Sequence, residues 1–99
     1  MEPTGEGVYI LRLSRPLAGR AQFYVGYTTN VQGRLYYHRQ GKGAAFTREA
    51  VRQGIQMDLV LWIPGGTRQL ERRIKNQKNT GRFIQRYINR LQKGGAAHV

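Results

Sequence analysis

The chain has 99 residues, which is the length of a single domain. It contains 17 lysines and arginines but only 5 acidic residues, and the resulting formal net charge of +12 predicts a polyanionic partner such as nucleic acid. Without cysteine it can form neither disulfides nor thiolate metal sites, and no apolar run approaches the ~20 residues of a membrane span, so we expect no membrane partner and a cytoplasmic or nucleoid-associated location.

The first part of the chain predicts a β-hairpin. Residues 1–6 are polar and predict a flexible N-terminus. Residues 8–13 are rich in branched apolar side chains and predict a strand, whereas residues 14–20 contain proline and glycine and predict a loop. Residues 22–28 alternate aromatic and small side chains, which is typical of a second strand. We expect the two strands to pair antiparallel.

A helix is predicted after this hairpin. Asn30 is a favourable N-cap, and Val31 and Leu35 are spaced four apart, so they can face the core together. Arg34 and His38 share the same spacing on a neighbouring stripe of that helix. A guanidinium and an imidazole on this stripe, two tyrosines on the strands (Tyr9 and Tyr24) and the basic net charge together indicate chemistry on a phosphate.

Residues 40–45 follow the helix and contain two glycines around a lysine. Such a loop allows backbone amides to approach an anion closely. An ordinary helix stop followed by a turn explains the same residues equally well, and spacing alone does not separate the two readings.

The second part of the chain predicts one strand and three helices. Residues 46–53 predict a short helix, and the almost continuous apolar run 57–63 predicts the best-buried strand. Residues 68–78, capped by Thr67, and 82–91 predict two amphipathic helices. The fold class is therefore α+β, with a small three-stranded, mostly antiparallel sheet flanked by helices in the order β-β-α-α-β-α-α. The domain spans residues 7–92, and residues 93–99 predict a flexible tail.

Glu71 is the acidic residue that needs an explanation, because it lies among arginines near the start of a predicted helix. The simple interpretation is a carboxylate favoured by the helix dipole and paired with Lys75 one turn on. The functional interpretation is a metal ligand, because Mg²⁺ is often held by one or two carboxylates, waters and a substrate phosphate.

Several of these residues stand in a known order. Gly-Val-Tyr at residues 7–9 and Tyr-Val-Gly at residues 24–26 are followed by Arg34 ten residues after the second tyrosine, by His38 four further on, and by Glu71 on a later helix. In this pattern the chain resembles the GIY-YIG endonuclease family, which takes its name from two such tripeptides.

The resemblance covers residues 7 to 80 and is greatest to the small, stand-alone, single-domain members. Residues 41–48 are similar to the stretch that follows the first helix in those proteins. For the family's late asparagine the candidate is Asn79, with Asn76 as the alternative.

The resemblance implies hydrolysis of a DNA phosphodiester with one Mg²⁺ or Mn²⁺ ion per active site, held by Glu71. It implies that Tyr9 is the general base or relays to it, which requires nearby cations to lower its pKa from ~10. Arg34 would stabilise charge on the phosphate, while Tyr24 and His38 would complete the network, with His38 a rival general base. Further basic residues would position the strand: Lys42, Arg48, Arg72, Lys75 and Lys78.

Two other functions are compatible with the composition. A non-catalytic basic module that binds RNA or DNA explains the charge equally well, although it leaves Glu71 unexplained. A degenerate family member that only binds DNA is the third interpretation. The preferred form of DNA is not encoded in any readable motif, and both a homodimer and a targeting partner protein are compatible with the sequence.

Overall fold

A computed structural model describes residues 4–19, 21–77 and 79–97, with side chains described as far as Leu91. The secondary structure confirms the α+β class and the expected order of elements. The elements are β1 (Gly7–Leu17), β2 (Ala21–Thr28), α1 (Val31–Arg39), α2 (Ala45–Arg52), β3 (Met57–Pro64), α3 (Arg68–Asn76) and α4 (Thr80–Ala97).

The three strands form one antiparallel sheet in the order β2-β1-β3. Strand β1 is central, and its apolar residues from Val8 to Leu11 are all buried. The prediction that residues 57–63 form the best-buried strand is wrong, because β3 lies at the edge of the sheet and Val60 and Trp62 are only half-buried. Strand order depends on pairing across the chain, which hydrophobicity alone does not reveal.

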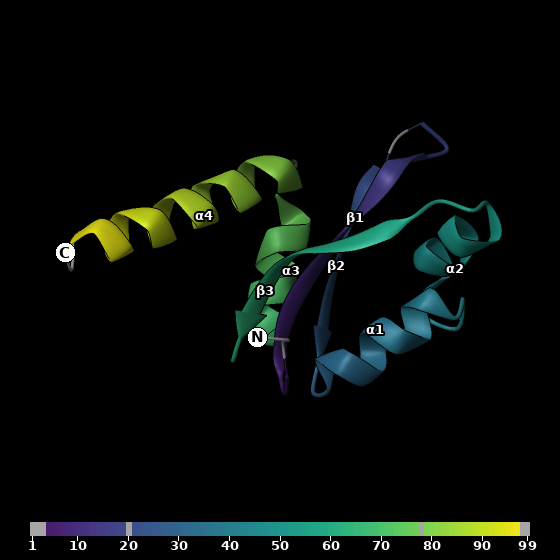
Figure 1. The fold of residues 1–99 in the computed structure, drawn as a ribbon, viewed down its shortest axis with the longest axis horizontal. Coiled ribbons are helices and arrows are strands. Elements are labelled where there is room, and N and C mark those ends of the chain that lie inside the picture. The colour runs from purple at the N-terminus through teal and green to yellow at the C-terminus, as the bar shows by residue number, and fades with distance from the viewer. Residues whose placement is uncertain (1–3, 20, 78, 98–99) are drawn as a thin grey trace.

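Helices cover both faces of the sheet (Figure 1). Helices α1 and α2 lie on one side, and α3 and α4 lie on the other, with the end of α4 projecting away from the body. Because side chains alternate along a strand, Val8 and Ile10 pack with Ile74 of α3 and Ile84 of α4, whereas Tyr9 packs with the α1 face. The central strand therefore supplies both cores.

Two elements run further than expected. Strand β1 continues to Leu17, through a region predicted to be a loop, because the chain shifts register after Arg12 and pairs Leu17 with Ala21. In the turn that follows, Ala18 and Gly19 have positive φ angles. Helix α4 continues to Ala97 through the segment predicted as a tail, since glycines weaken a helix but, unlike proline, keep the backbone donor. Residues 98–99 lie outside the described residues.

Candidate active site

A chain of three buried side chains links β1, α1 and α2. The Tyr9 hydroxyl lies 2.6 Å from His38 Nε2, and His38 Nδ1 lies 2.6 Å from Thr47 Oγ1. The Thr47 hydroxyl in turn donates to the carbonyl oxygen of Ala44 at 3.0 Å. Tyr9 and His38 are 1% exposed and Thr47 is fully buried. These groups are therefore held in a dry, fixed arrangement.

The hydrogen bonds assign the tautomer of His38. Because the Thr47 proton is used by Ala44, Thr47 Oγ1 is the acceptor and His38 Nδ1 carries the proton. His38 Nε2 is then unprotonated and accepts the bond from the Tyr9 hydroxyl. The imidazole is thus aligned to receive a proton from the phenol.

Burial keeps both members of this pair neutral. It raises the pKa of Tyr9 to about 12, against the opposing effect of the Arg34 guanidinium. Burial, assisted by Arg34, lowers the pKa of His38 to about 4. The expectation that cations lower the pKa of Tyr9 is therefore wrong for the resting protein, because desolvation outweighs the neighbouring charge.

Two glycines make room for these rings. Tyr9 pairs with Gly26 across the β1–β2 ladder, and a Cβ built on Gly26 would meet the Tyr9 ring, including Cε1 at 2.6 Å. A Cβ on Gly43 would likewise collide with the imidazole of His38, which it would meet at Nδ1 and, at 2.8 Å, Cε1. The glycines are required by close approach, and the Gly43 loop is shaped around His38.

The loop after α1 ends the helix. The N–H groups of Gly41 and Lys42 donate to the carbonyl oxygens of His38 and Tyr37, so these two amides are used within the turn. Of the two interpretations left open by the sequence, the helix stop is the one the structure supports.

Tyr9 also lines a polar hollow of about 380 Å³, which lies at one edge of the sheet. The hollow brings together four of the predicted catalytic residues: Tyr9 of β1, Tyr24 of β2, Arg34 of α1 and Glu71 of α3. The tyrosine ring centroids are 6.2 Å apart, and the phenols raise the pKa of Arg34. The fifth predicted residue, His38, lies behind Tyr9 and does not line the hollow.

Glu71 is the carboxylate of this hollow. Its side chain is 16% exposed, and Oε2 lies 3.3 Å from Lys75 Nζ. Lys75 also lies 5.7 Å from the centroid of the Tyr24 ring. Its interaction with Glu71 is the simple pairing that the sequence suggested, and of the two residues only Glu71 lines the hollow.

A divalent metal would have a small protein ligand set here. Among the residues that the structure describes, no group of three or more histidine, aspartate or glutamate side chains comes together. One partly exposed carboxylate in a polar hollow, beside phenol oxygens, fits a hydrated Mg²⁺ or Mn²⁺ ion whose remaining ligands are waters and a phosphate. Glu71 is the residue that would hold it.

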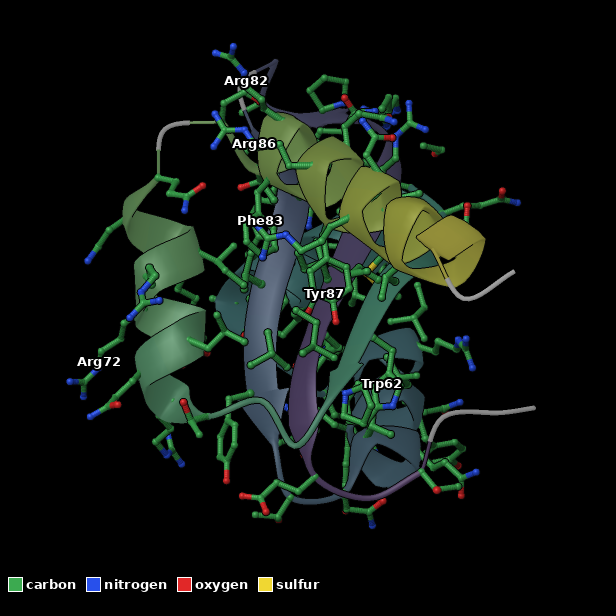
Figure 2. The ribbon with its side chains drawn as sticks, turned by 90° about the vertical axis from the view of Figure 1, so that its left-hand side faces the viewer. Trp62, Arg72, Arg82, Phe83, Arg86 and Tyr87 are labelled. Carbon is green, nitrogen blue, oxygen red and sulfur yellow. The ribbon has the colours of Figure 1, made fainter. Side chains whose placement is uncertain are left out.

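The predicted nucleic-acid contacts are more scattered than the catalytic residues. Lys42, Arg48 and Arg72 are exposed, and Figure 2 shows Arg72 pointing away from α4 and the sheet. Lys78 lies outside the described residues. Asn79, the candidate for the late asparagine, accepts a hydrogen bond from the Arg82 N–H at 3.0 Å and caps α4, so it is not among the residues that line the hollow.

Two residues of the site carried no sequence signal of their role. Thr47, which the sequence placed only in a short predicted helix, orients His38. Arg68, expected only as a neighbour of Glu71, lines the hollow and lies 4.9 Å from the centroid of the Tyr27 ring. Tyr27 also lines the hollow, and its hydroxyl donates to Glu6. Local sequence patterns do not predict such contacts, because the contacts join residues that are far apart in the chain.

A model of the GIY-YIG catalytic domain matches residues 6–87. The chain belongs to the GIY-YIG family. GIY-YIG is a family of nuclease domains, and all the residues that line the hollow fall within the matched range. In the described part of the chain, none of the helices is long and apolar enough to cross a membrane.

The chain is also similar to a UPF0213 protein of Streptococcus sanguinis (strain SK36). The two are 57% identical over 30 residues, which is 30% of this chain and 34% of the streptococcal protein. The match therefore spans about a third of that relative's length. No solved structure matches the chain.

Proposed function

We propose that this GIY-YIG protein is a divalent-metal-dependent endonuclease that hydrolyses DNA phosphodiester bonds. The observation that carries the proposal is the convergence of Tyr9, Arg34 and Glu71 in one polar hollow, with a buried proton acceptor behind Tyr9. A module that only binds nucleic acid has no need of an oriented phenol–imidazole pair.

The proton path begins at the Tyr9 oxygen. The attacking water gives a proton to this oxygen while the Tyr9 proton passes to His38 Nε2, along the bond that already joins them. Thr47 keeps the second imidazole nitrogen protonated, so the ring can accept at Nε2 only. A negatively charged phosphodiester in the hollow would raise the pKa of His38 from its resting value of about 4, which favours this transfer.

Arg34 and Glu71 act on the phosphate itself. The Arg34 guanidinium offers paired donors to the charge that develops on the non-bridging oxygens. Glu71 would hold Mg²⁺ or Mn²⁺, which, when bound, polarises the phosphate and stabilises the leaving oxygen. Lys75 Nζ lies 3.3 Å from Glu71 Oε2, so an ion held on that oxygen would displace the ammonium and leave it to contact the strand.

The decisive experiment is a cleavage panel with the purified protein. Single-stranded, duplex and branched DNA, and matched RNA, are incubated with Mg²⁺, with Mn²⁺ or with a chelator. Glu71→Ala is compared with Glu49→Ala, which removes an exposed carboxylate that pairs with Arg52 on α2. Tyr9→Phe removes the relay hydroxyl and leaves the ring in place.

We expect cleavage of DNA with either metal, its loss on chelation, and its loss in Glu71→Ala and Tyr9→Phe but not in Glu49→Ala. Binding should survive in both inactive variants. If the wild-type protein binds these nucleic acids and cuts none of them with either metal, the endonuclease proposal is wrong and a binding module is the better account.

A further inference from the structure

A second hollow lies between α3 and α4, on the opposite face of the sheet from α1. We call it the α3–α4 groove. Its volume is about 270 Å³, and it shares no lining residue with the catalytic hollow. Helix α3 contributes to both: Arg68 and Glu71 line the catalytic hollow, whereas Leu70 and Arg73 line the groove. The phosphate being cut cannot occupy the groove, so any ligand of the groove is a different group.

The rim of the groove is positively charged. It carries Arg73 of α3 together with Arg86 and Arg90 of α4, all of them exposed. Arg86 and Arg90 are four residues apart and therefore lie on one stripe of α4. No acidic residue lines the groove, and none of the three arginines has a salt-bridge partner among the described residues. The groove is thus complementary to a polyanion.

The wall on the α4 side is aromatic. Figure 2 shows Phe83 and Tyr87 pointing from α4 towards the sheet, with Arg86 at the outer side of the same helix. The two rings line the groove and lie 6.1 Å apart between centroids. Both are half-buried, so part of each ring is accessible from the groove. A groove with an arginine rim and an aromatic wall suits a ligand with both an anionic and a planar apolar part.

We propose that the α3–α4 groove binds an unpaired segment of the nucleic acid strand, away from the scissile bond. The arginines of the rim bind successive phosphates, and Tyr87, with Phe83, offers ring surface to a base. This inference rests on the proposed nuclease function, because it assigns the groove to a flanking part of the same substrate.

Unpaired nucleic acid fits better than duplex or protein. In a duplex the bases are stacked on each other and the outer surface presents phosphate and sugar, so the aromatic wall would have no counterpart. An unpaired strand exposes bases that stack on aromatic side chains while its backbone follows a basic groove. Arginine forks match phosphate geometry, and the chain's net charge of +12 favours nucleic acid over most proteins.

Photo-cross-linking tests the contact directly. Single-stranded DNA with 5-iodouracil at successive positions is irradiated with the full-length protein, and the cross-linked peptides are identified after trypsin digestion. Cleavage after each arginine of α4 separates Phe83 and Tyr87 into peptides 83–86 and 87–90, while the exposed tyrosines of α1 fall in peptide 35–39. We expect cross-links in peptides 87–90 and 83–86, with the yield lowered in Tyr87→Leu and kept in Tyr87→Phe.

Salt titration tests the phosphates. The variant R86Q/R90Q is compared with R12Q/R39Q, which removes the same charge from exposed arginines of β1 and α1. Each phosphate contact to a single strand contributes about 0.7 to the slope of log affinity against log salt concentration. R86Q/R90Q should lower the slope for single-stranded DNA by about 1.4, and R12Q/R39Q should leave it unchanged. For a duplex, adding a 5′ or 3′ unpaired extension should tighten binding to wild type but not to R86Q/R90Q.

The outcomes separate this inference from the nuclease proposal. Unchanged slopes in R86Q/R90Q, with no cross-link to residues 83–90, would overturn the groove assignment and leave the groove to a protein ligand, even if wild type cuts DNA. Cross-links to α4 and the lowered slope would support the assignment even if wild type cuts nothing, in which case the nuclease proposal alone would fail.

Discussion

Thr47→Val removes one hydroxyl from behind the reaction centre and changes little else in shape. In the wild-type protein Thr47 Oγ1 accepts the proton of His38 Nδ1 at 2.6 Å, within a fully buried pair. The valine methyl cannot accept a hydrogen bond. His38 must then either bury an unpaired N–H or move its proton to Nε2, and a protonated Nε2 cannot accept from Tyr9.

The cost to stability follows from burial. A buried donor without a partner costs about 1–3 kcal/mol, and each kcal/mol lowers the Tm of a domain of this size by about 4–8 °C. The cost to activity is larger, because the tautomer shift disables the acceptor for the general base. General-base catalysis contributes about 10²–10⁴-fold, so kcat should fall by about 100-fold or more while KM changes little.

Thr47→Ser is the matched control. Serine keeps the hydroxyl and loses a buried methyl, which destabilises the core without disturbing the hydrogen bond. Cleavage is measured under single-turnover conditions, well below both Tm values, with thermal unfolding recorded for each variant. If Thr47→Val and Thr47→Ser have the same kcat after their stabilities are matched, Thr47 does not position His38 and the relay is wrong.

Three further results are expected. Gly26→Ala should abolish cleavage and lower Tm, because its Cβ would collide with the Tyr9 ring; an active, stable variant would contradict the close approach. Glu71→Ala should unfold within about 0.5 kcal/mol of wild type in urea, since it loses only a partly exposed pair with Lys75. Between pH 6.5 and about 4, His38 is protonated in the unfolded chain but stays neutral in the folded protein. The free energy of unfolding should therefore fall by up to roughly 3 kcal/mol as the pH is lowered through this range. His38→Gln should remove that part of the pH dependence in urea titrations; an unchanged profile would show that His38 is not the group responsible.

The sequence predicted what depends on local signals. Asn30 and Thr67 were expected as N-caps, and their side chains accept from the N–H groups of Gly33 and Leu70. The apolar and aromatic alternation of the first strands likewise predicted a hairpin, which β1 and β2 form. Caps and alternation are encoded within a few residues, so they are readable without any tertiary information.

What the sequence could not predict depends on contacts between distant segments. The central position of β1 is set by its pairing with β3, some fifty residues further along the chain. The raised pKa of Tyr9 is a consequence of burial, whereas the general-base role that the resemblance implied for Tyr9 required a lowered pKa. The role of Thr47 was not predictable for the same reason. Its hydrogen bond with His38 depends on how α2 packs on α1, which no local pattern encodes.

The position of the hollow at the β2 edge explains how one tyrosine can be both buried and reactive. Tyr9 stands on the central strand, and its ring reaches past Gly26 on the edge strand to the catalytic hollow. The ring is enclosed by the fold, while the oxygen meets the hollow on one side and His38 on the other. Arg34 and Glu71 come from helices on opposite faces of the sheet and meet around that same edge. The site is therefore built from the helices on both faces of the sheet. Gly26 is essential to it, because a side chain at this position would displace the Tyr9 ring that reaches the hollow.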